Sequence, residues 1–269
     1  MLVLHGIGST RDDFAALEPR LAAEYEVLSV DFPGHGGSAA LDVRPTVGAV
    51  ADVLESDLDR LGFGRVHVLG NSLGGRVALE LARRHRARSV LAIAPSGMGL
   101  VPERVYQGLA MSAARVSLRR VRGLITPMSG SRAGRTLLLA GLRARPARAS
   151  SAEAQAVPGG FAESTGFWRM LWWSVLLDVP TRLRDVDCPV LLAQGVRDLL
   201  SGGQTPRYLP LVPRSRFQPL LRAGHAPHSD TPDAIVELVH RATHAGREQF
   251  GAVDDRRSHP TIELVEATA

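Results

Sequence analysis

Short apolar runs alternate with stretches of helical periodicity through the first third of the chain. The runs cover residues 2–4, 27–30, 66–69 and 90–94. Between the second and third runs, Thr46 is placed to cap a helix in which apolar residues recur every three or four positions. Strands that are apolar throughout and alternate with helices indicate a mostly parallel sheet covered by helices on both faces.

The same alternation returns near the end of the chain. Residues 190–193 and 217–221 are further apolar runs, and Thr231 and Pro232 open a helix with an apolar face. Pro219 lies inside the second run, and proline is tolerated best in an edge strand because it cannot donate a ladder hydrogen bond. We therefore expect the last strand at one edge of the sheet.

The middle of the chain shows helical spacing without strand patterns. We expect residues 1–97 and 184–250 to form an α/β core. Residues 98–183 are expected to form a helical cap, or lid, inserted after the fourth strand and lying over the carboxyl edge of the sheet. Residues 251–269 lack periodicity, and we expect them to be a flexible tail.

Composition favours a soluble globular protein of 269 residues, with 45% hydrophobic and 22% charged residues. No apolar run reaches the roughly 18 residues needed to span a membrane, and no secretory leader is recognisable. The single cysteine, Cys188, excludes an internal disulfide and is interpreted as structural. We expect a cytoplasmic location.

The positive charge of the chain is carried entirely by arginine, with a formal net charge of +5 and no lysine. Biased codon usage explains this better than a nucleic-acid surface, for which no motif is present. However, no acidic residue occurs in residues 104–152, where ten arginines stand. A solvated helical face is one interpretation. The other is a lid that attracts an anionic substrate, an acidic carrier protein or a membrane surface.

The strongest chemical signal is Gly70-Asn71-Ser72-Leu73-Gly74, which fits the G-x-S-x-G nucleophile elbow between a strand and a helix. Small residues on either side allow strand and helix to approach, and this lifts the serine hydroxyl above the sheet. There the helix N-terminus favours developing negative charge. Ser72 is therefore the candidate nucleophile; the alternative is a glycine-rich turn whose serine only caps the helix.

A nucleophilic serine needs a base, and the base needs an acid to orient it. Asp198 follows the strand at residues 190–193, and His225 follows the next strand, so both belong to the carboxyl edge of the sheet. Asp185 and Asp187 precede the strand and are interpreted as solvated loop residues. His228 is the weaker candidate for the base because no glycine precedes it.

An oxyanion formed during acyl transfer needs two N–H donors. We expect them to be the amides of Leu73, directly after the nucleophile, and of Ile7 in the first glycine-rich loop. His5, in the same loop, is interpreted as a residue that shapes the loop and not as a second base.

With these motifs in family order, the sequence resembles the α/β-hydrolase superfamily, of the lidded fold-1 serine-hydrolase type. The segments that carry the resemblance are His5-Gly6-Ile7-Gly8, Asp31-Phe32-Pro33-Gly34-His35-Gly36, Gly70 to Gly75, Gly195-Val196-Arg197-Asp198 and Gly224-His225. The resemblance implies a Ser72–His225–Asp198 triad and no metal or organic cofactor. Ser72 argues against haloalkane dehalogenases and epoxide hydrolases, which use aspartate at that position.

One departure from the family concerns the first two strands, which usually precede the His-Gly loop and are absent here. Residues 27–30 would then form an exposed sheet edge. Two hypotheses follow: the protein begins upstream of Met1, or another chain covers the edge, for instance in a homo-oligomer.

Substrate contacts are expected from Asn71, beside the nucleophile, and from the lid. Trp168 and Trp172 share a helix face near Phe161 and Phe167. One interpretation is that they pack the lid onto the core; the other is that they line an apolar pocket over Ser72.

The function expected is hydrolysis of a carboxylic ester or thioester, acting on a small acyl substrate that could be anionic. A first alternative is a carbon–carbon bond hydrolase of vinylogous diketo acids. Asn71, the turn at residues 94–99 and the basic lid resemble that family, but Ala226 stands where its members carry tryptophan. A second alternative is a non-catalytic binding protein of the same fold.

Overall fold

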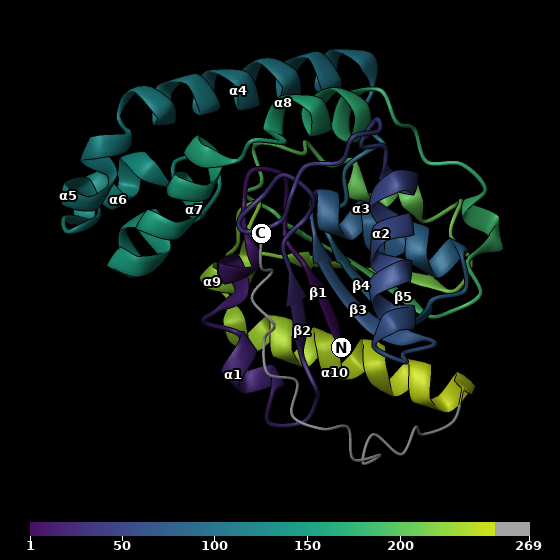
Figure 1. Ribbon diagram of the computed structural model, residues 1–269. Coiled ribbons are helices and arrows are strands. Elements are labelled where there is room, and N and C mark those ends of the chain that lie inside the picture. Colours follow the sequence, from purple (N-terminus) through teal and green to yellow (C-terminus); the bar gives the residue numbers. More distant parts are fainter. Residues whose placement is uncertain (251–269) are drawn as a thin grey trace.

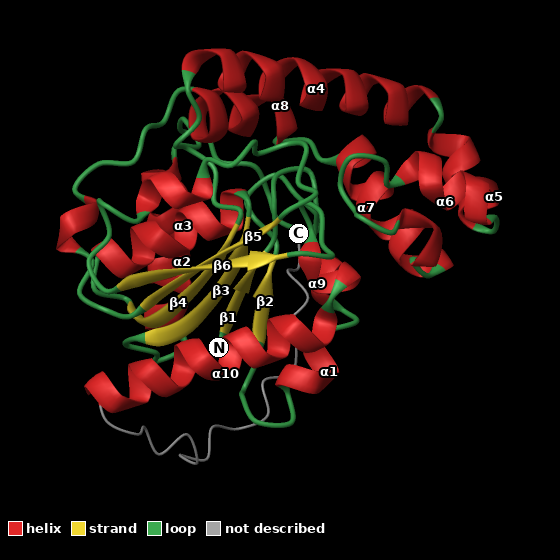
Figure 2. Ribbon diagram, turned by 180° about the vertical axis from the view of Figure 1, so that it is seen from behind, coloured by secondary structure: helices red, strands yellow, loops and turns green. Residues whose placement is uncertain are grey.

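The computed structural model describes residues 1–250 (Figures 1 and 2). The tail expected at residues 251–269 lies outside the described part. A single twisted sheet occupies the centre, with helices on both of its faces and a group of helices beyond one end of the strands. This is the layered α/β architecture that the sequence predicted.

The sheet has six strands, all parallel, in the order β2-β1-β3-β4-β5-β6. Their bounds are β1 (Leu2–Leu4), β2 (Leu28–Val30), β3 (Val66–Asn71), β4 (Ala87–Ile93), β5 (Val190–Gly195) and β6 (Ser215–Leu220). Every apolar run predicted to be a strand is one. Pro219 lies in β6, at an edge of the sheet, which confirms that expectation.

Helices fill the intervals between strands. The α-helices are α1 (Glu18–Leu21), α2 (Val47–Arg60), α3 (Leu73–Arg83), α4 (Val101–Arg120), α5 (Ile125–Ser129), α6 (Arg132–Leu138), α7 (Ser151–Glu163), α8 (Phe167–Met170), α9 (Pro227–Asp230) and α10 (Pro232–Phe250). Short 3₁₀ turns are η1 (Arg11–Phe14), η2 (Arg122–Leu124), η3 (Pro146–Arg148), η5 (Leu183–Asp185) and η6 (Thr205–Tyr208), and η4 (Leu171–Leu176) is a π-helical turn. Thr46 caps α2 as expected, because its hydroxyl accepts a hydrogen bond from the Ala49 amide.

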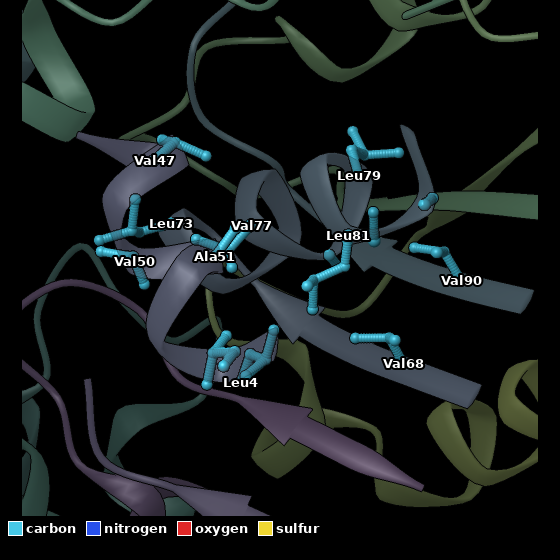
Figure 3. Close-up of a cluster of buried hydrophobic side chains, with 14 of the residues drawn as sticks. Leu4, Val47, Val50, Ala51, Val68, Leu73, Val77, Leu79, Leu81 and Val90 are labelled. Carbon is cyan, nitrogen blue, oxygen red and sulfur yellow. The ribbon is translucent and has the colours of Figure 1, made fainter. Parts of the chain in front are cut away.

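Side-chain alternation along the strands divides the core into two layers. In β1, Leu2 and Leu4 belong to the cluster that packs against α2 and α3, whereas Val3 belongs to the cluster against α1 and α10. Figure 3 shows the first cluster, where Leu4 and Val68 of the sheet lie beneath the two helices. Each such large side chain, fully buried, stabilises the fold by about 1.5–3 kcal/mol, so the sheet is a rigid support for whatever follows its strands.

The long interval between β4 and β5 contains helices and no strand among the described residues, as the sequence predicted. Helices α4 to α8 lie beyond the carboxyl ends of the strands (Figure 1). Part of this helical insertion has its own small apolar cluster, built from Ile125, Leu138, Leu139, Ala154, Val157 and Ala162. The boundaries proposed for separate core and cap domains stay a prediction.

Strand β2 forms one edge of the sheet and pairs with β1 alone in the described chain. The edge expected at residues 27–30 is therefore present. Its cover by a preceding segment or by a second copy stays a prediction. No helix within residues 1–250 has the length and apolar character needed to cross a membrane.

Candidate active site

Ser72 stands at the junction of β3 and α3 in a backbone conformation that side chains rarely adopt, with φ 56° and ψ −116°. Three backbone hydrogen bonds hold it there. The Ser72 amide donates to the Ile93 carbonyl at 2.8 Å, and the Ser72 carbonyl accepts from the amides of Arg76 and Ser96. A strained backbone of this kind persists only where the surroundings determine it, and here the surroundings are the end of β4 and the first turn of α3.

Two glycines of the elbow permit the close approach of strand and helix. A Cβ on Gly70 would lie 2.2 Å from the Gly74 carbonyl oxygen, and a Cβ on Gly74 would lie 2.1 Å from the Leu4 carbonyl oxygen. Neither distance is compatible with a side chain. The residues around Ser72 are thus small because the backbones of β1, β3 and α3 meet there, which was the steric reason given for the motif.

His225 follows β6, and its Nδ1 lies 2.9 Å from Oδ2 of Asp198, which follows β5. Both residues are buried. Burial lowers the pKa of His225, but the Asp198 carboxylate outweighs it, so the pKa lies above the ordinary histidine value. Burial likewise raises the pKa of Asp198, whereas the charge of His225 and several hydrogen bonds hold that pKa well below its usual range. Asp198 is therefore an anion that orients the imidazole.

The remaining lone pairs of Asp198 are satisfied by neighbours that the sequence did not reveal. Its Oδ1 accepts from the amides of Leu200 at 2.9 Å and Ser201 at 3.0 Å. Its Oδ2 accepts from the Ser201 hydroxyl and, at 3.3 Å, from the Gln194 amide. Ser201 three residues after the aspartate was the available signal, since short polar side chains often close such turns.

Ser72 and His225 both line one cavity of about 400 Å³ at the carboxyl edge of the sheet. The core contributes Ile7 and Asn71, and the helical insertion contributes mostly apolar residues. Those from the insertion are Tyr106, Ala110, Met111, Ala114, Ser117, Leu118, Leu137, Leu138, Ala140, Gly141, Leu142, Val157, Pro158 and Phe161. The cavity is thus formed between the sheet edge and α4, α6 and α7.

The amides of Ile7 and Leu73 have no hydrogen-bond partner within residues 1–250. Leu73 is the first residue of α3, so its N–H has no acceptor one turn earlier in the helix. Ile7 lies in the loop after β1 and lines the same cavity as Ser72. Both amides expected to serve an oxyanion are therefore free to donate to a ligand oxygen.

His5 and His35 fasten the Ile7 loop to the loop after β2. Nε2 of His5 accepts from the Phe32 amide at 2.9 Å, and Nε2 of His35 accepts from the Gly8 amide at 3.0 Å. Burial lowers the pKa of both rings, that of His35 to about 3, which keeps them neutral acceptors. His5 shapes the loop, as expected; the reciprocal role of His35 was not foreseen.

The structure places Asn71 in the cavity wall, but its amide nitrogen is engaged by the backbone. It donates to the carbonyl of His225 at 2.9 Å and of Ile93 at 3.4 Å. Trp168 and Trp172 do not line the cavity, and they lie half-exposed on the insertion. Trp168 packs edge-on against buried Phe167. The two tryptophans are thus separated from the site, whereas Phe161 reaches it.

The competing residues have other partners. His228 is buried, and its Nε2 lies 3.0 Å from Oδ1 of Asp13, which also has Arg143 at 3.7 Å. Asp185 pairs with Arg182, and Asp187 pairs with Arg65 and His85. Unlike His225, none of these three residues lines the cavity that contains Ser72 in the described chain. No group of three metal-binding side chains is present in residues 1–250.

Asp230 joins the histidine loop to the helical insertion, a role that no sequence signal suggested. Its carboxylate accepts from the amides of Gly224 at 2.9 Å, Ala144 at 2.8 Å and Arg145 at 3.1 Å. A Cβ on Gly224 would lie 2.7 Å from the Leu142 carbonyl oxygen, so the two segments are in direct contact. The position of His225 is therefore coupled to that of the insertion.

Comparison with known proteins identifies the family of the chain. Residues 1–238 match the model of the alpha/beta hydrolase family. The chain is 30% identical over 254 residues to the pimeloyl-[acyl-carrier protein] methyl ester esterase of Neisseria meningitidis serogroup B, covering 88% of this chain and 89% of the relative.

Two further similarities are more limited, the first in length and the second in sequence identity. A dihydrolipoyllysine-residue acetyltransferase component of the acetoin cleaving system from Pseudomonas putida is 33% identical over 122 residues, which are 44% of this chain and only 33% of that relative's length. The solved structure of a thermophilic esterase from Thermogutta terrifontis has a TM-score of 0.66 at 22% identity, covering 91% of this chain and 89% of that one. With its six-stranded parallel sheet and its match over nearly nine-tenths of its length, the chain belongs to the alpha/beta hydrolase family.

Proposed function

We propose that the protein is a serine hydrolase that cleaves a carboxylic ester or thioester through an acyl-enzyme intermediate. The observation that carries the proposal is the His225 Nδ1–Asp198 Oδ2 hydrogen bond of 2.9 Å in the cavity that holds Ser72 at its strained elbow. These are the nucleophile, base and orienting acid that acyl transfer requires.

In the proposed reaction, the Ser72 hydroxyl attacks the carbonyl carbon while His225 Nε2 takes its proton. Asp198 holds the opposite ring nitrogen protonated and stabilises the imidazolium that forms. The tetrahedral intermediate collapses as His225 returns the proton to the departing alcohol or thiol. Water then attacks the acyl-enzyme with the same histidine as base, and the carboxylic acid leaves.

The unpartnered amides of Ile7 and Leu73 are the proposed donors to the oxyanion. Backbone donors of this kind cost no reorganisation when the charge develops, and one such donor is worth about 100- to 1,000-fold in rate in a comparable site. The ring contacts of His5 and His35 keep the Ile7 loop in place, and the α3 dipole adds to the effect at Leu73.

The lining of the cavity favours an uncharged acyl chain over a carboxylate-bearing one. No arginine lines the described cavity, although ten arginines stand in residues 104–152. A diketo acid bound inside would place its carboxylate against aliphatic side chains, at a large desolvation cost. The similarity to the esterase from Neisseria meningitidis, which is named for a methyl ester, also supports ester hydrolysis.

The test is intact mass after treatment with a fluorophosphonate probe, on wild type, Ser72→Ala and Ser9→Ala. Ser9 lines the same cavity and serves as the matched control. We expect one adduct on wild type and Ser9→Ala and none on Ser72→Ala, followed by turnover of simple esters and not of a diketo acid. A folded wild type that takes up no probe would sink the proposal in favour of a binding protein.

A further inference from the structure

Helix α4 exposes a continuous apolar stripe on the outside of the insertion. Val101, Val105, Leu109 and Val116 are exposed by 72%, 56%, 68% and 39%, and their spacing places them along one side of the helix. Of the whole helix, only Gln107, Met111 and Arg115 are buried. A row of large aliphatic side chains left in water is the kind of surface that marks an interaction site.

The stripe is continuous with the mouth of the cavity that contains Ser72. Tyr106, Ala110 and Ala114 line that cavity; the first two directly follow the stripe residues Val105 and Leu109, and Ala114 precedes Val116 by two positions. Tyr106, Leu137 and Leu199 line the cavity and are themselves more than half exposed. Apolar surface therefore runs from the outer side of α4 over the rim and into the cavity.

Arginines without carboxylate partners flank the same surface. Arg119 and Arg120 end α4 within one turn of cavity-lining Ser117 and Leu118, and Arg122 and Arg132 follow in η2 and α6. All four arginines are exposed, and none has an acid within ion-pair distance in the described chain. By contrast, Arg104 and Arg115 are used inside the fold, where they donate to backbone carbonyls.

A second copy of this chain is a poor occupant for the surface. A two-fold dimer brings the same patch of both subunits together, so the arginines would meet each other with no carboxylate from residues 104–152 to neutralise them. An acidic protein would pair with the arginines, yet its charged groups would also have to be desolvated against the aliphatic stripe. The surface needs a partner that is apolar and anionic at once.

We propose that the outer face of α4, with Arg119, Arg120, Arg122 and Arg132, docks on an anionic lipid bilayer. The aliphatic side chains enter the boundary between headgroups and acyl chains, and the guanidinium groups meet the lipid phosphates. The purpose of this docking rests on the proposed hydrolase function. An acyl chain would pass from the bilayer across the cavity rim at Tyr106 and Leu137 to Ser72, without crossing water.

The test is sedimentation of the full chain with vesicles of phosphatidylcholine alone, or of two parts phosphatidylcholine and one part phosphatidylglycerol. We expect binding to the second kind only, weakened by added salt because screening reduces the attraction. Leu109→Asp should abolish it, since a carboxylate would then enter the apolar boundary.

The charge part of the interface is tested by the triple variant Arg119→Gln, Arg120→Gln, Arg122→Gln. Each basic residue near an anionic surface strengthens binding about five-fold, so the triple variant is expected to bind about 100-fold more weakly. A matched triple on the core, Arg60→Gln, Arg184→Gln and Arg216→Gln, removes the same charge from exposed positions away from α4. The vesicle affinity of this control variant should stay within about three-fold of the wild-type affinity, because only the net charge of the protein has changed.

Hydrolysis of a short, water-soluble ester is measured on every variant, and it separates this inference from the proposed function. Equal hydrolysis with lost vesicle binding supports the docking surface. Lack of hydrolysis by wild type defeats the proposed function and leaves the vesicle result to decide docking. Docking is overturned if the wild type does not bind anionic vesicles, or if the α4 triple variant binds them as well as the wild type does. It is also overturned if the protein binds a purified acidic acyl carrier protein instead and Leu109→Asp does not weaken that binding.

Discussion

Helices α3 and α4 show how differently the two parts of the molecule are built. Every residue of α3 from Leu73 to Ala82 is buried, and the backbone of its first turn touches β1 and β3 directly. Helix α4 is nearly twice as long and buries three side chains. Tight packing holds the backbone of Ser72 in place, as reaction chemistry demands, whereas the looser insertion supplies most of the cavity wall.

The polar groups of the site and the apolar wall of the cavity therefore come from different segments of the chain. The polar groups of the candidate site follow strands of the sheet: the Ile7 amide follows β1, Ser72 follows β3, and Asp198 and His225 follow β5 and β6. Most of the cavity wall comes from α4, α6 and α7. Four substitutions would break or sharpen this division.

The largest effect is expected for Asp198→Asn. In the proposed mechanism this substitution lowers kcat by about 10,000-fold, as loss of the orienting acid does in a comparable triad, and it should do so equally for short and long esters. Wild-type activity should rise with pH through a His225 pKa above the ordinary value, because only the neutral ring accepts a proton. With the carboxylate gone, burial dominates, and the inflection should move to lower pH. A pH–rate profile measures both.

The control for that substitution is Asp187→Asn, which removes a carboxylate from an ion pair with Arg65 away from the cavity. It should leave the rate and its inflection unchanged. An Asp198→Asn profile that keeps the wild-type inflection would contradict the role given to the aspartate.

Gly74→Ala tests the tight packing of the core. The new Cβ would lie 2.1 Å from the Leu4 carbonyl oxygen, so the backbones must separate, at a cost of about 3 kcal/mol in the free energy of unfolding. Gly123→Ala is the counterpart in the insertion, where a Cβ meets nothing within 4 Å. Urea denaturation should show a loss for the first and none for the second; equal losses would refute the contrast between the two regions.

Ala114→Phe tests the insertion as the selector of acyl chains. Ala114 lines the cavity, so a phenyl ring there should lower kcat/KM for long-chain esters by about 10- to 100-fold, the range that pocket fit commonly provides. Short esters should be spared. Ala113→Phe adds the same ring one position earlier, at an exposed site outside the cavity, and should change neither. Similar slowing of short and long esters by Ala114→Phe would mean that the insertion does more than select.

Asp230→Ala tests the contact between the two regions and should have the smallest effect. Loss of the carboxylate frees the amides of Gly224, Ala144 and Arg145, which water can partly satisfy because Asp230 is only half-buried. We expect a loss of about 1–2 kcal/mol in stability and a fall of several-fold in kcat with KM unchanged. Asp233→Ala, whose carboxylate is 89% exposed beside Arg20, is the control. A change in KM alone would contradict the proposed positioning of His225.

Local patterns in the sequence were sufficient for the strands, for α2 and α3, and for the candidate residues Ser72, Asp198 and His225. These patterns are local: the apolar runs, the cap at Thr46 and the glycines around Ser72 depend on residues nearby in the chain or in the same strand. Residues 11–21 form two short helices, η1 and α1, with Pro19 in the first turn of the second. Proline suits a helix start and interrupts a longer helix.

What the sequence by itself determined is the order of strands and loops that brings a serine, a histidine and an aspartate to one edge of a parallel sheet. Tertiary structure alone decided which side chains of the insertion face that edge. Trp168 and Trp172 do not line the cavity, whereas Phe161 does, and Asp230 gained its partners Ala144 and Arg145 only through packing. The physical reason is that periodicity fixes which residues share a face, whereas the neighbour of that face is set by contacts between segments far apart in the chain.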